Sequence, residues 1–261
     1  MFTKKQLSII DIVSENDVIF TENLERLIAD RSNRYKIMNR LTEKGILEKH
    51  VINSRRSVWY FSELGKAVAK QNDPSYFSYF KIDDLDLTTL NHTSKLIDIQ
   101  LSLQSLEDPI YAFKNEKYIT RYFESNKTDI KQRAQGTTMR IPDMAFDDTD
   151  HNPCCLELEL SQKSKARYRH IYNFYRYFKD YNYVFWVYQD NHVCDTIMTY
   201  FSDFYINDLN DYDLTNPDHV ETLKTVKERH LFFHYDDFIK DGMKADCIPF
   251  SQSEAVEMVA I

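Results

Sequence analysis

The sequence of 261 residues predicts an α/β protein, α+β overall, in which a small helical module precedes a larger core built on a mixed sheet. Apolar residues recur at helical spacing early in the chain, and two alternating, strand-like segments follow. After residue 91, strand-like and helix-like runs alternate, which is typical of a sheet covered by helices. Residues 1–72 hold 7 lysines and 6 arginines against 9 acidic residues, whereas the whole chain has a net charge of −8. We therefore expect a basic module joined to an acidic domain.

The basic module, residues 1–72, is expected to contain three short helices and a β-hairpin. Helical patterns cover residues 3–17, 21–30 and 32–45, and Gly45 is a typical residue for the position just after a helix. Two alternating segments then flank a basic turn, and a last helical pattern closes the module. This order resembles a winged helix, in which the third helix enters the major groove of DNA and the hairpin contacts the backbone.

Side chains suited to DNA are concentrated on the two elements that would touch it. Arginine and asparagine can read base edges, whereas lysine and wing arginines mainly hold phosphates. The third helix and the wing offer Asn33, Arg34, Lys36, Asn39, Arg40, Arg55 and Arg56. Two other interpretations stay open, namely a winged helix that contacts a protein and a charged face that is simply solvated.

A linker is expected at residues 73–90, where Asp73-Pro74 and several serines interrupt the helical pattern. The second domain would then span residues 91–261. It opens on a helical pattern of leucines and isoleucines, and Asp98 lies on or near this otherwise apolar helix.

Three carboxylates stand out within residues 140–165. Asp143 follows a proline in one strand-like run, and Glu157 and Glu159 alternate with leucines in the next. If the two runs form a hairpin symmetric about the turn at Asp150, Asp143 lies directly opposite Glu157. Because side chains alternate along a strand, Glu159 falls on the same face.

Carboxylates gathered on one patch repel one another, which raises the pKa of at least one unless a cation lies between them. Oxygen ligands of this kind suit Mg²⁺ or Mn²⁺. Such an ion can activate water or stabilise charge during attack on a phosphodiester. The pattern therefore predicts a metal site formed by Asp143, Glu157 and Glu159. The alternative is a strand whose outer face is solvated and carries glutamate for that reason.

Composition argues against several other classes of site. The chain has 4 glycines and neither GxGxxG nor GxxxxGK[ST], so glycine loops that bind phosphate are not expected. Its 4 cysteines form no CxxC pair and HExxH is absent, so neither a zinc site nor a disulfide framework is expected. No apolar segment approaches ~20 residues and no signal peptide is recognisable, so we expect a cytoplasmic protein without a membrane partner.

The carboxylate segment resembles the PD-(D/E)xK nuclease superfamily. The Pro-Asp pair that ends at Asp143 matches the first motif, and Glu157-Leu-Glu159 matches the second, with glutamate where lysine is usual. A winged helix followed by such a core is similar to the replication–relaxation proteins and the MobC-type plasmid relaxases, which have a restriction-endonuclease-like fold. The resemblance covers residues 1–190 and rests on domain order and short motifs.

What the resemblance implies is a Mg²⁺- or Mn²⁺-dependent nickase that acts at a plasmid transfer or mobilisation origin. Asp143, Glu157 and Glu159 would be the catalytic and metal-binding residues, Asp98 would assist them, and Lys163 would stabilise the developing phosphorane charge. The glutamate in place of lysine leaves the general-base role open. Expected partners are double-stranded DNA, or locally melted origin DNA, together with accessory transfer proteins; a homodimer is compatible with this role.

The segment after the carboxylates, residues 164–181, is expected to form a helix with a buried aromatic stripe. Arg167 and Arg169 lie within two turns of the carboxylates and are candidate phosphate contacts. With 18 tyrosines in the chain, covalent attack by a tyrosine stays open beside attack by water. Two other functions remain alternatives: a non-catalytic accessory protein that binds plasmid DNA, and a transcription regulator on a nuclease-like fold.

Overall fold

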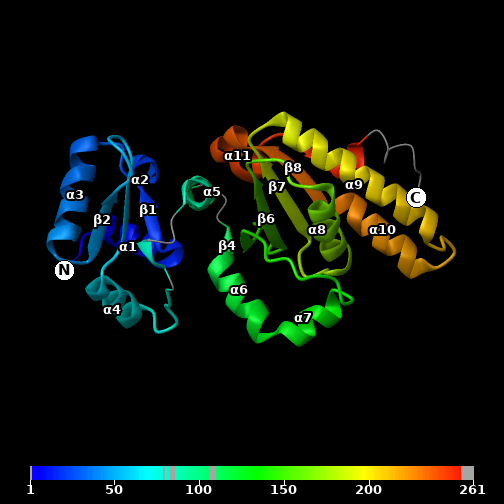
Figure 1. The fold of residues 1–261 in the computed structure, drawn as a ribbon, viewed down its shortest axis with the longest axis horizontal. Coiled ribbons are helices and arrows are strands. Elements are labelled where there is room, and N and C mark those ends of the chain that lie inside the picture. The colour runs from blue at the N-terminus through cyan, green and yellow to red at the C-terminus, as the bar shows by residue number, and fades with distance from the viewer. Residues whose placement is uncertain (1, 79, 83–85, 106–109, 254–261) are drawn as a thin grey trace. The chain divides into compact units, whose positions relative to one another are not determined.

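The computed structural model describes residues 2–78, 80–82, 86–105 and 110–253 (Figure 1). It is a mixed α/β structure that divides into two compact units, residues 1–101 and 102–261. Among the described residues, no helix has the length and apolar character needed to cross a membrane.

The N-terminal unit packs its helices on a three-stranded antiparallel sheet. Its strands follow the order β1-β3-β2, and Lys49 of β2 pairs with Trp59 of β3. Its elements are α1 (Lys4–Asn16), β1 (Val18–Phe20), α2 (Thr21–Leu27), α3 (Arg31–Glu43), β2 (Leu47–Val51), β3 (Ser57–Phe61), α4 (Glu63–Asn72) and the larger part of α5 (Leu87–Ser105).

The boundary between the units differs from the expected linker at residues 73–90. Helix α5 contributes Leu90, Ile97 and Leu101 to the hydrophobic core of the N-terminal unit. The apolar stripe that seemed to open the second domain therefore belongs mostly to the first. Residues 79 and 83–85 of the expected linker lie outside the described part of the chain.

Local capping explains where the helices of the N-terminal unit begin and end. Helix α3 starts one residue before the expected Ser32, because the side chain of Asp30 accepts a hydrogen bond from the backbone N–H of Asn33. Arg31 therefore becomes its first residue. After the last turn, Gly45 adopts a φ of 68°, a conformation in which glycine has no steric penalty.

The C-terminal unit is built on a six-stranded mixed sheet. In spatial order its strands are β4 (Tyr111–Asn115), β5 (Met144–Asp147), β6 (Pro153–Glu159), β7 (Tyr183–Tyr188), β8 (His230–His234) and β9 (Cys247–Pro249). Strands β6, β7 and β8 are parallel, and the outer pairs are antiparallel. Its helical elements are α6 (Glu116–Ser125), α7 (Lys127–Arg133), α8 (Lys165–Tyr177), α9 (Asn191–Asp211), α10 (Pro217–Arg229), α11 (Tyr235–Asp241), η2 (Gly242–Lys244) and η3 (Phe250–Gln252).

Helices cover both faces of the central strands. Helices α8, α9 and α10 lie over one face (Figure 1). On that face, Trp186 of β7 packs edge-to-face on Phe201 of α9. On the other face, Phe238 of α11 packs against Phe185 and Phe233. Strands buried on both sides are nearly continuous apolar runs, as the sequence of β7 shows.

Candidate functional sites

The first candidate site lies where β5, β6 and α8 of the C-terminal unit meet. Met144 pairs with Leu156, so the register expected from a symmetric turn is confirmed. Asp143 precedes β5, and its backbone N–H donates to the carbonyl of Leu156 at 3.1 Å. Its carboxylate accepts the backbone N–H of Leu158 at 2.7 Å, which fixes this side chain against β6.

Glu157 and Glu159 are buried rather than solvated, with 0% and 1% of their surface exposed. Glu157 lies beside Trp186 in the sheet register, on the face that α8 and α9 cover. The interpretation of a solvated outer face is therefore wrong. A carboxylate in such a place costs free energy unless hydrogen bonds or counter-charges compensate it.

Two residues from distant parts of the chain compensate Glu157. Arg140 donates from Nε to Oε1 at 3.0 Å, and its Nη2 forms an ion pair with Oε2. The Tyr175 hydroxyl on α8 donates to Oε1 at 2.5 Å. Burial raises the pKa of Glu157 above its ordinary value, and Arg140 opposes that rise. Both oxygens of this carboxylate are thus engaged by the protein itself.

Glu159 is only half compensated. Its Oε1 forms an ion pair with Lys163, whereas Oε2 is buried without a hydrogen-bond partner in the described part of the chain. Burial raises the pKa of Glu159 to about 7; Lys163 opposes this rise, and the charges on Glu157 and Asp143 add to it. Glu159 therefore gains or loses a proton near neutral pH.

This arrangement does not fit a divalent ion shared by all three carboxylates. Arg140 would have to leave Glu157, and Lys163 already occupies one oxygen of Glu159. Over the residues that the structure describes, no group of three or more His, Cys, Asp or Glu side chains is placed to hold a metal. The acceptor still open to a ligand is Glu159 Oε2.

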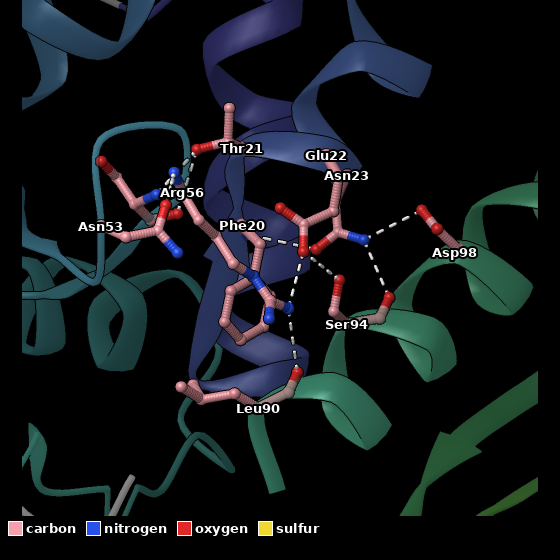
Figure 2. A network of polar contacts seen from close by, with 10 residues as sticks. Phe20, Thr21, Glu22, Asn23, Asn53, Arg56, Leu90, Ser94 and Asp98 are labelled. Atoms are coloured by element: carbon pink, nitrogen blue, oxygen red, sulfur yellow. Dashed lines mark hydrogen bonds and ion pairs between the residues drawn. The ribbon is translucent and has the colours of Figure 1, made fainter. Parts of the chain in front are cut away.

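Asp98, expected to assist these carboxylates, belongs to the N-terminal unit and has partners there. Asn23 of α2 donates to its Oδ1 at 2.9 Å, and Arg26 forms an ion pair with the same oxygen at 2.9 Å. Asn23 also donates to the carbonyl of Ser94 at 2.9 Å (Figure 2). Asp98 thus ties α5 to α2.

Arg56, expected at the wing, takes part in the same polar network. It forms an ion pair with Glu22 at 2.7 Å, donates to the carbonyl of Leu90 at 3.3 Å and lies over the ring of Phe20 (Figure 2). The Ser94 hydroxyl donates to Glu22 at 2.8 Å. The guanidinium therefore holds α5 against the sheet instead of projecting from the wing tip.

Arg34 is also committed within the N-terminal unit. Its Nη1 donates to the carbonyls of Ile28 and Ala29, which follow the end of α2, at 2.9 and 3.0 Å. Its Nη2 pairs with Glu25 at 3.1 Å. These bonds satisfy carbonyls that the end of α2 leaves open, so Arg34 fixes the turn between α2 and α3.

The remaining candidates on α3 and the hairpin form the second candidate site. Lys36, Asn39, Arg40 and Arg55 are exposed, and Asn33 is half-buried. Two exposed cations that the sequence interpretation missed are Arg31 and Lys49. Asp30 as helix cap would have revealed Arg31, and strand alternation would have placed Lys49 on the α3 side of the hairpin. Among the described residues, no carboxylate pairs with Arg31, Lys36, Arg40, Lys49 or Arg55.

A groove of about 420 Å³ runs between α3 and the hairpin. Leu24, Met38 and Trp59 line it and are buried, so they form an apolar floor. Arg31 and Arg55 are among the exposed cations on its rim.

On α8, the expected buried stripe is confirmed, and it includes Tyr168, Tyr172 and Tyr175. Arg167 is exposed near the start of the helix, whereas the Arg169 guanidinium lies 4.1 Å from the centre of the Phe204 ring. Only Arg167 therefore projects into solvent as expected for a phosphate contact.

Comparisons of the chain with known protein families, with characterised proteins and with solved structures give no match. The resemblance to PD-(D/E)xK nucleases and plasmid relaxases therefore rests on sequence motifs and domain order alone.

Proposed function

We propose that the N-terminal unit is a winged helix that binds double-stranded DNA. The order α1-β1-α2-α3-β2-β3 and the antiparallel sheet β1-β3-β2 support this assignment. In such a module, α3 would lie in the major groove and the β2–β3 hairpin along the backbone. Asn39 and Arg40 would face base edges, and Arg55 would contact phosphate.

The observation that carries the proposal is the set of exposed cations on α3 and the hairpin that no carboxylate neutralises in the described residues. The chain as a whole has a net negative charge, whereas this surface of the N-terminal unit gathers positive charges. Alternation along β2 places Glu48 on the face opposite Lys49, away from the groove. Phosphate binding by such a surface supplies affinity through release of counterions.

Salt dependence of DNA binding tests the proposal. We expect the full chain to bind a pool of short random duplexes, measured by fluorescence anisotropy, with a log Kd that rises linearly with log salt concentration. Arg31→Ala and Arg55→Ala should each lower that slope by about 1, because each removes one phosphate contact. Sequencing the bound fraction would then reveal any preferred site.

Lys70→Ala is the matched control, because Lys70 is an exposed cation on α4 of the same unit. Its salt slope should equal that of the unaltered protein. Equal losses of slope in the Lys70 and Arg55 variants, or no salt-dependent binding at all, would overturn the proposal.

A nickase or endonuclease activity of the C-terminal unit is a second proposal, favoured by the half-compensated, near-neutral Glu159. A carboxylate that titrates near pH 7 is suited to moving a proton during phosphodiester hydrolysis. The charges on Glu157 and Asp143 would help to keep the pKa of Glu159 raised. A Mg²⁺ or Mn²⁺ ion would supply charge stabilisation, but the three carboxylates do not fit it, so this proposal assigns only the proton transfer, to Glu159.

Supercoiled plasmid carrying a sequence selected by the N-terminal unit tests this activity. We expect open-circle product in the presence of Mg²⁺ or Mn²⁺, and its loss in Glu159→Gln, which keeps the shape of the side chain and removes its basicity. Glu124→Gln on α6, an exposed position, should cut normally. Tight binding of the same plasmid without product under either ion would leave only the DNA-binding role.

A further inference from the structure

The groove between α3 and the hairpin has two features that a paired duplex does not require. Its floor is apolar, and Tyr35 and Val51 on its walls are each 59% exposed. Its lining carries four cations against one carboxylate, Glu25, which Arg34 pairs. An apolar, aromatic-lined hollow with a cationic rim is complementary to a planar base attached to phosphate.

We propose that this groove holds one unpaired nucleobase, so that the N-terminal unit prefers DNA with an extrahelical base to a perfect duplex. The inference rests on the proposed function, since the DNA must first be bound by α3 and the hairpin. The base would stack on Tyr35 above the floor formed by Met38 and Trp59. Its flanking phosphates would meet Arg31 and Arg55 on the rim.

The different burial of Trp59 and Tyr35 indicates which ring a base would stack on. Trp59 is 8% exposed, and Lys49 Nζ lies 5.4 Å from the centre of its ring, so its accessible face is already partly covered. Tyr35 projects from α3, is 59% exposed and provides the accessible ring. Asn39 also lines the groove and offers an amide to the base edge. A fully paired helix would bury its base faces by stacking and leave this floor unfilled.

Fluorescence anisotropy with three labelled DNAs tests the inference: a perfect duplex, the same duplex with one bulged thymine, and the single strand. We expect the unaltered protein to bind the bulged duplex at least about fivefold more tightly than the perfect one. Tyr35→Ala should remove that preference and leave affinity for the perfect duplex within about twofold, because base stacking on an aromatic ring is lost while phosphate contacts remain. Tyr35→Phe should retain the preference.

Each other outcome has a defined meaning. Equal affinity of the unaltered protein for perfect and bulged duplexes would overturn the inference and leave duplex binding intact. Absence of binding to all three DNAs would instead contradict the proposed function itself. A glutamate-rich peptide that competes with the bulged duplex for the unaltered protein, but no longer binds Tyr35→Ala, would reassign the groove to an acidic protein segment.

Discussion

At the scale of single residues, the molecule places three acidic side chains where solvation is nearly lost and gives each a different compensation. Asp143 accepts a backbone N–H, Glu157 is bound by Arg140 and Tyr175, and Glu159 keeps one buried oxygen without a partner in the described residues. Buried charges are tolerated when hydrogen bonds and counter-charges complete the site. Glu159 lacks that completion, so its ionisation should cost stability.

Glu159→Gln should reduce the loss of unfolding free energy that the C-terminal unit shows between pH 5 and pH 8. Because the pKa of Glu159 is raised by burial to about 7, the folded state keeps a proton that the unfolded chain loses near pH 4.5. Stability from this group is thus present at low pH and falls as pH rises from 4.5 to 7, by up to about 3 kcal/mol. The free energy of unfolding in urea, measured at pH 5 and pH 8, should fall less in the glutamine variant.

Glu124→Gln is the control for that comparison, because it removes a carboxylate from an exposed position on α6 of the same unit. Should Glu159→Gln change the unfolding free energy by the same amount at pH 5 and at pH 8, Glu159 would not carry the assigned titration. The result bears on catalysis as well, since the same proton would move in the proposed hydrolysis.

At the scale of elements, local sequence patterns predicted strand register and helix faces, but they did not predict contacts between residues far apart in the chain. The β5–β6 register followed from the turn at Asp150, and the buried stripe of α8 followed from helical spacing. The partners of Glu157 could not be predicted, because Arg140 lies 17 residues away in the segment before β5 and Tyr175 lies 18 residues away on α8. Alternating glutamate and leucine also suggested one solvated face, although both faces of this strand are buried.

The polar network between α2 and α5 is a second case in which the partners of charged residues could not be predicted from the sequence. Arginine at a wing and aspartate on an apolar helix predicted DNA and metal contacts from their positions in the chain. In the folded unit, Arg56 reaches Glu22 and Leu90, and Asp98 reaches Asn23 (Figure 2). Arg56 and Asp98 thus hold α5 in place and do not contribute to the DNA or metal sites expected for them. Periodicity identifies the face of such a residue and says nothing of its partner.

At the scale of the whole molecule, each of the two units has its own hydrophobic core, and each unit has its own proposed role. One core gathers residues of α1, α3, β3 and the larger part of α5, and the other gathers α8, α9, α10 and the sheet they cover. Units with separate cores commonly unfold as separate cooperative steps. The charge asymmetry of the sequence indicated this division, but the packing of α5 moved the boundary to Leu101.

The two tryptophans allow this separation to be measured, because Trp59 lies in one core and Trp186 in the other. In a Trp59→Phe background, fluorescence follows the C-terminal unit alone. In this background, Arg56→Ala should leave the urea midpoint unchanged, although it should lower the stability of the N-terminal unit by about 1–3 kcal/mol through loss of its ion pair and hydrogen bond.

Arg229→Ala is the positive control for this measurement. Arg229 donates to the carbonyls of Tyr175 and Phe178 at the end of α8, so its loss should lower that midpoint. A midpoint that Arg56→Ala lowers as much as Arg229→Ala would mean that the chain unfolds as one cooperative body.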